Sequence, residues 1–155
     1  MNTMRFVVKG ACCLIALLAA NVAGAEPKAY TGATKGDWSV DANWTPAGVP
    51  GAGDEVVIAD KAVTLNGAAA VASLTLEAGA TLTVQAAPSV SPALADLYVN
   101  ATEVKVTGAL TVAAGATLRP VCDIETGAPV VFRVGSFSLA DGGLVDAFGA
   151  GYGWM

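Results

Sequence analysis

The stretch LTLEAGATL at residues 74–82 recurs almost unchanged as LTVAAGATL at residues 110–118. In each copy, leucine or valine alternates with threonine, and a small-residue segment around a glycine separates two such runs. Alternation with a period of two is typical of a strand with one buried and one exposed face, and the glycine-centred segment is typical of a turn. The repeated unit is therefore predicted to be a strand, a tight corner and a second strand.

Similar short runs of valine, isoleucine, leucine and threonine, broken by glycine, asparagine, aspartate and proline, continue along most of the chain. Beyond residue 25, no window combines apolar residues at helical spacing with capping residues. This pattern predicts an all-β fold. The predicted strands are Glu55–Ile58, Ala62–Leu65, Ala72–Leu76, Thr81–Gln85, Asp96–Val99, Glu103–Val106, Ala109–Val112, Thr117–Arg119, Val130–Val134, Phe137–Ala140 and Leu144–Ala147.

Two arrangements of these strands fit the pattern. A recurring strand-corner-strand unit cannot bury its inward face alone, so it stacks on its neighbours, as in a parallel β-helix or solenoid. Short strands with frequent turn signals also suit a β-sandwich, in which Asn66-Gly67 would form a hairpin turn. The small-residue corners favour the β-helix, because stacked bends leave little room for side chains. We expect β-helix layers over residues 55–155, with the β-sandwich as the alternative.

Residues 26–54 differ from the rest in having aromatic residues and turn formers but few strand signals. An open stack of strands needs a cover for its terminal layer, and Trp38 and Trp44 on an irregular segment suit that role. This segment is therefore predicted to be an amino-terminal cap. The alternative is that the two tryptophans form an exposed platform that stacks on sugars.

The first residues have the three parts of a secretory signal. Arg5 and Lys9 precede a short apolar run, and Ala23-Gly24-Ala25 supplies a small-residue cleavage site. The apolar run is shorter than the roughly 20 residues that cross a bilayer. We therefore expect residues 1–25 to be removed after Ala25 and the remaining chain to be secreted or held at the cell surface.

Charge and composition exclude several activities. The exported part would keep all 13 acidic residues, but its few basic residues are scattered, which argues against nucleic-acid binding. The chain has no histidine, which rules out Ser-His-Asp and Cys-His catalysis. Cys122, the one cysteine outside the leader, is expected to be a small buried side chain. No cofactor and no metal are expected.

One acidic pair has the spacing that would place both carboxylates on one side of a strand. Asp123 and Glu125 are two residues apart, and in an extended segment they could hold calcium or act as acid and base on a polysaccharide. A lone acidic pair more often keeps a loop soluble, here before Thr126-Gly127. We name no catalytic residue.

The order of motifs also resembles known families. Gly36-Asp37-Trp38-Ser39, Asn43-Trp44 and Gly48–Ile58, followed by the strands up to Val84, resemble the start of the passenger region of bacterial autotransporter-like and PEP-CTERM-type surface proteins. The segment is also similar to the G8 domain, which shares the tryptophan and the Pro-Gly-x-Gly-Asp turn. Both resemblances imply a right-handed parallel β-helix. The glycine-rich segment from Gly142 to Gly153 resembles a later part of such surface proteins.

The expected function is an exported structural or adhesive segment of a bacterial cell-surface or extracellular protein, without catalysis of its own. Proteins of these families run much longer, so the chain is expected to be truncated, with outer-membrane attachment only through parts beyond Met155. Extracellular glycans or the surface of a host or neighbouring cell are the expected partners. The alternatives are a fragment of a carbohydrate-active β-helix enzyme and a glycan-binding module that uses Trp38 and Trp44.

Overall fold

The computed structural model describes residues 26–88 and 101–147, which form two β-sheets. The seven-stranded sheet contains β1 (Pro27–Tyr30), β3 (Trp44–Thr45), β4 (Glu55–Ile58), β6 (Ala69–Val71), β7 (Ser73–Leu76), β9 (Thr102–Val112) and β11 (Val130–Leu139). The five-stranded sheet contains β2 (Lys35–Asp37), β5 (Ala62–Asn66), β8 (Thr81–Gln85), β10 (Thr117–Val121) and β12 (Leu144–Val145). A single 3-10 turn, η1 (Asp41–Asn43), precedes β3. The all-β prediction is confirmed.

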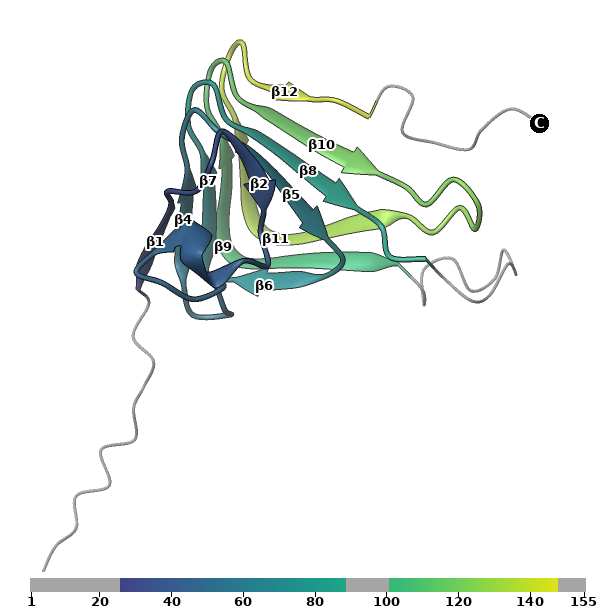
Figure 1. The fold of residues 1–155 in the computed structure, drawn as a ribbon. Coiled ribbons are helices and arrows are strands. Elements are labelled where there is room, and N and C mark those ends of the chain that lie inside the picture. Colours follow the sequence, from purple (N-terminus) through teal and green to yellow (C-terminus); the bar gives the residue numbers. More distant parts are fainter. Residues whose placement is uncertain (1–25, 89–100, 148–155) are drawn as a thin grey trace, which may run out of the picture.

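Strands that are neighbours in a sheet run parallel in every described pair except β1 and β3. The chain passes from one sheet to the other and returns beside its own earlier strand, so the order in the five-stranded sheet is β2, β5, β8, β10, β12. The two similar sequence stretches lie next to each other, with Leu74 opposite Leu110 and Leu82 opposite Leu118. Figure 1 shows the strands as three walls around a common interior.

The interior is a column of aliphatic side chains from successive strands. Val63, Leu82 and Leu118 are register partners in the five-stranded sheet, and all three are almost fully buried. Their neighbours in sequence point outward, as the alternating burial of β5 and β8 shows. Burial of each such side chain contributes roughly 1.5–3 kcal/mol. The alternation of apolar and polar residues in the sequence thus places one apolar side chain after another in a continuous core.

One corner of the structure depends on backbone conformations that favour glycine. Gly79, Gly115 and Gly142 have φ values of 80°, 76° and 81° and occupy equivalent corners in successive layers. Gly79 N–H donates to the Gly115 carbonyl at 3.1 Å, and Gly115 N–H donates to that of Gly142 at 2.9 Å. Asp60, which precedes β5 and has a φ of 47°, lies against Gly79 on the side away from Gly115. Positive φ strains residues that carry a Cβ, which explains why glycine recurs here.

A second corner bends β9 and β11 in mid-strand. The first half of β9 pairs with β6 and the second half pairs with β7. At the bend, Gly108 N–H donates to the Ala72 carbonyl at 2.7 Å, and a Cβ on Gly108 would come within 2.8 Å of the same oxygen. Gly135 occupies the equivalent place in β11, at a register shift. The segments predicted as separate strands on either side of these glycines are therefore two single bent strands.

The other strand predictions differ in how closely they match. Strands β4 and β8 have their predicted bounds, and β5, β7, β10 and β12 differ from theirs by one or two residues at one end. Strands β1, β2, β3 and β6 were not predicted. The hairpin that the β-sandwich alternative placed at Asn66-Gly67 is absent, because the flanking β5 and β6 belong to different sheets. The predicted strand Asp96–Val99, the predicted leader 1–25 and the glycine-rich segment after residue 147 lie outside the described residues.

Candidate functional site

Trp38 and Trp44 lie together at the end of the structure where the first strands are. Trp38 follows β2 and Trp44 begins β3, and their side chains are only 3% and 2% exposed. The two indoles meet edge to face with ring centroids 4.8 Å apart, and Trp44 meets Tyr30 in the same way at 5.2 Å. Stacking on a sugar requires an exposed ring face. Neither indole has one, which argues against the sugar platform.

The aromatic cluster formed by Tyr30, Trp38 and Trp44 is continuous with the aliphatic core. Strands β2 and β3 are the edge strands of their sheets, so the cluster sits over the first layer of that core. The cap predicted for residues 26–54 would place the tryptophans at such an end, and it stays a prediction. The segment is more regular than expected, since β1 pairs in parallel with β4 and β2 with β5. The boundary at residue 54 remains a prediction.

Asp37 ties this segment to the neighbouring layer. Its Oδ1 accepts hydrogen bonds from the Ser39 backbone N–H at 2.7 Å and from the Ser39 hydroxyl at 2.6 Å. Its Oδ2 accepts from the Asn66 side-chain amide at 3.0 Å. These bonds, those of Ser39 above all, lower the pKa of the Asp37 carboxyl. Asp37 is thus an ionised structural group that fastens the tryptophan-bearing turn to the end of β5.

The Tyr30 hydroxyl is buried without a hydrogen-bond partner among residues 26–88 and 101–147. It lies between Gly32 and Gly36, where an added Cβ at either glycine would collide with it. Burial raises the pKa of this hydroxyl, and the charge of Asp37 raises it further. The phenol therefore stays protonated and is a packing group in the cluster.

The Asp123 carboxylate is occupied by a turn after β10. Its Oδ1 accepts from the backbone N–H groups of Glu125 and Thr126, each at 2.9 Å, and the bond from Thr126 contributes most to a lowered carboxyl pKa. The Asp123 backbone carbonyl also accepts from Gly127 N–H at 2.7 Å. Residues 124–126 form a turn and not the extended segment that would align the two carboxylates. The pair therefore does not form the convergent site that was considered for it.

Metal binding and thiol chemistry would depend on the acidic and cysteine side chains. No group of three or more acidic, cysteine or histidine side chains gathers within the described ranges in a way that could hold a metal ion. Cys122 is a free thiol that is partly exposed and not fully buried, which corrects the expectation of a core side chain. It lies directly before the Asp123 turn, and Asp123 and Glu125 line the same shallow surface pocket.

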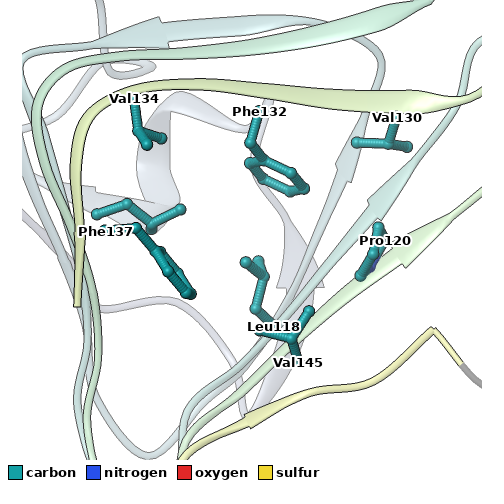
Figure 2. Close-up of a pocket in the computed structure, with 8 residues that line it drawn as sticks. Leu118, Pro120, Val130, Phe132, Val134, Phe137 and Val145 are labelled. Atoms are coloured by element: carbon teal, nitrogen blue, oxygen red, sulfur yellow. The ribbon is translucent and has the colours of Figure 1, made fainter. Parts of the chain in front are cut away.

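Sequence reasoning missed an apolar cavity of about 260 Å³ at the opposite end of the structure from the tryptophans. Figure 2 shows aromatic and aliphatic side chains from β10, β11 and β12 pointing into it. None of the lining side chains is charged. The lining residues are Leu110, Leu118, Pro120, Val130, Phe132, Val134, Phe137 and Val145. The alternation within Val130–Val134 indicated inward-facing side chains, but nothing in it indicated that β11 is the last strand of its sheet.

Comparison with known proteins gives one match. Neither the curated proteins nor the solved structures include a significant match to the chain. In the described ranges, no helix has the length and hydropathy to cross a membrane. A family described as "Domain of unknown function (DUF8693)" matches residues 29–134, from the aromatic cluster into β11. Because this match covers more than half of the sequence, the chain belongs to the DUF8693 family.

Proposed function

We propose that the chain is an exported structural or adhesive segment of a bacterial cell-surface or extracellular protein, built as a right-handed parallel β-helix with an amino-terminal cap. It has no catalytic activity of its own in this proposal. The observation that carries the proposal is the parallel register of successive strands in both sheets, from β2 to β12 and from β1 to β11.

The parallel register supports a β-helix for a geometric reason. Parallel neighbours need a crossover connection, and here the connection of each strand runs through the other sheet before the chain returns. The stacked corner at Gly79, Gly115 and Gly142 supports the same arrangement, because equivalent bends follow one another at hydrogen-bond distance. Stacked layers of this kind produce long, regular surfaces suited to spacing or adhesion.

The leader and the amino-terminal motifs support export. Residues 1–25 have the basic end, short apolar run and small-residue site of a cleaved signal. The resemblance of Gly36–Ser39, Asn43-Trp44 and Gly48–Ile58 to autotransporter-like and PEP-CTERM-type surface proteins points to the same compartment. Removal of the leader would leave Cys122 as the sole cysteine, so the exported chain would be stabilised by packing without an internal disulfide.

The export proposal is tested by producing the full chain in a Gram-negative bacterium and measuring the intact mass of the product in each cell fraction. We expect a product that begins at Glu26 and is found outside the cytoplasm. An Ala23→Asp, Ala25→Asp variant should retain the leader, because both small residues of the cleavage site are replaced. Wild-type chain that stays in the cytoplasm with residues 1–25 attached would contradict the proposal.

Adhesion is tested by binding of the purified chain to a glycan array and to intact bacterial and host cells. The Trp38→Ala and Trp44→Ala variants accompany the wild type, with folding checked by circular dichroism. In the proposed cap role both variants lose stability, and any loss of binding follows from the loss of folded protein. A folded variant that has lost glycan binding would instead favour a sugar site at the tryptophans, and cleavage of a glycan by the wild type would favour the enzyme alternative.

A further inference from the structure

Two of the chain's eight lysine and arginine residues, Lys105 and Arg133, lie side by side although they are far apart in the sequence. They are register partners on the parallel strands β9 and β11, and neighbouring strands are about 4.8 Å apart. Both side chains are exposed, and Lys105 points away from the core, because Val104 and Val106 on either side of it are buried. The strand pairing thus brings together two cations that the sequence scatters.

Neither cation is fully neutralised by its surroundings. The Nε–H of Arg133 donates to Glu103 Oε2 at 2.6 Å, and the two Nη groups of Arg133 have no hydrogen bond to another described residue. Lys105 has no acidic partner among the described residues. Like charges beside each other destabilise a sheet, and local conflicts of this kind are expected at functional sites. The two cations and one carboxylate leave a net positive charge here, in a chain whose formal net charge is −5.

A shallow groove of about 590 Å³ lies beside the two cations on the outer face of the sheet, and its lining includes Lys105, Thr107 and Arg133. A second hollow of about 360 Å³ shares Lys105 and continues past Glu103 to Ala70 on β6. Strands β6, β9 and β11 are neighbours in one wall of the structure (Figure 1). The two hollows therefore extend across three strands, or roughly 10 Å. This gives a ligand room to lie flat on the sheet.

We propose that this groove binds the carboxylate of an acidic sugar, as in a uronate unit of an extracellular polysaccharide. Lys105 and the Nη groups of Arg133 bind the carboxylate, and Glu103 accepts a hydrogen bond from a sugar hydroxyl. The assignment rests on the adhesive part of the proposed function and gives that adhesion a ligand class.

The mixture of charges in the groove favours an acidic sugar over an acidic peptide. Ammonium and guanidinium groups donate charge-assisted hydrogen bonds to carboxylates. The Glu103 carboxylate only accepts hydrogen bonds, so a matching ligand carries donors close to its own carboxylate. A uronate ring has hydroxyl groups in that position, whereas aspartate and glutamate side chains have none. A peptide that adds a strand to a sheet would bind along the edge of β11, whereas these side chains project from the sheet face.

The test is calorimetric titration of the full chain, as recovered from cells, with trigalacturonate. We expect the wild type to bind trigalacturonate but not its methyl ester, which keeps the rings and loses the charge. Lys105→Gln and Arg133→Gln should each weaken binding about fivefold, because each removes one partly exposed charge contact. Arg119→Gln is the matched control, since Arg119 is an exposed cation in the other sheet. It should bind like the wild type.

Each outcome of the titration decides for or against the proposal. Weaker binding by the two groove variants, with unchanged binding by Arg119→Gln, supports it. If one groove variant unfolds, as judged by circular dichroism, the other gives the comparison. A wild type that does not bind trigalacturonate, or two folded groove variants that bind it equally well, would overturn the proposal. Equal binding of triglutamate, with the same loss in both variants, would overturn it in favour of an acidic peptide.

Adhesion to intact cells, measured with the same variants, separates this site from the proposed function. If Lys105→Gln and Arg133→Gln adhere as well as the wild type, the site is wrong and the adhesive function stands. If the wild type binds trigalacturonate through the groove but adheres to no cell, the site stands and the adhesive function is wrong.

Discussion

The indole N–H of Trp44 donates a hydrogen bond to the backbone carbonyl oxygen of Trp38 at 2.8 Å, with both residues buried. The bond closes the loop that contains η1 and satisfies the one polar atom of the Trp44 ring. It lets a large side chain be buried at the end of the core without leaving a donor unpaired. The aromatic cluster is therefore expected to be a major source of stability for the first layer.

Replacement of Trp44 tests this expectation. Trp44→Ala should lower the free energy of unfolding by about 3–5 kcal/mol, because it removes a buried ring and leaves a cavity. Trp44→Phe should cost less, since the ring contacts with Tyr30 and Trp38 are partly kept and mainly the hydrogen bond is lost. Urea unfolding measured by circular dichroism gives these values. Val49→Ala, at an exposed position of the same segment, should change the stability by less than about 0.5 kcal/mol.

The bend in β9 should tolerate only glycine. Gly108→Ala would place a methyl group within 2.8 Å of the Ala72 carbonyl oxygen, which already accepts the Gly108 N–H. We expect a loss of about 1–3 kcal/mol in unfolding free energy, as for other overpacking changes. Gly51→Ala is the control, because its nearest neighbour would be 3.9 Å away. Equal thermal stability of the two variants would show that the bend relaxes without cost.

The stability contributed by Asp37 should depend on pH. Its folded-state pKa is lowered below the ordinary aspartate value of about 3.9, so the contribution is complete above that value and is lost as pH falls through the folded-state pKa. Asp37→Asn removes the titration and should cost about 1 kcal/mol at pH 7, after allowance for solvent screening. Urea unfolding of both proteins between pH 2 and pH 7 gives the difference. If the difference in unfolding free energy between the two proteins grew as the pH fell, the prediction would be wrong.

The ion pair between Arg133 and Glu103 should contribute little. The two groups lie 2.6 Å apart across β11 and β9, but both are substantially exposed. Exposed pairs are typically worth between zero and 1 kcal/mol and are screened by salt. Arg133→Ala should therefore change the unfolding free energy by less than about 1 kcal/mol, and the change should shrink in 1 M NaCl. A larger loss that persists in high salt would point to packing of the arginine stem instead.

The sequence was most informative where a strand alternates and is bounded by turn residues. Glu55–Ile58 and Thr81–Gln85 were predicted to the residue because their periodicity is set by one buried face. β1 and β2 contain proline, glycine and charged residues and are strands because they pair with β4 and β5. Pairing of this kind is a tertiary effect that local propensity does not reveal.

The candidate sites were harder to predict for a related reason. The residues around Trp38 and Trp44 favoured a buried cover but left an exposed platform open, and the burial of both indoles depends on the strands folded beside them. At Asp123 the turn could have been anticipated, since Thr126-Gly127 follows and aspartate commonly accepts hydrogen bonds from the backbone two residues on. The apolar cavity depends on which strand is last in each sheet, and periodicity carries no information about that.

The first and last strands of the five-stranded sheet, β2 and β12, lie on opposite edges (Figure 1). A pull applied between these two strands would act across the sheet, along the hydrogen bonds that join its members. Each strand is bonded only to its neighbours, so such a load opens the pairs one after another instead of shearing them together. Under tension the molecule would lengthen in small successive steps, absorbing work gradually without a single abrupt rupture.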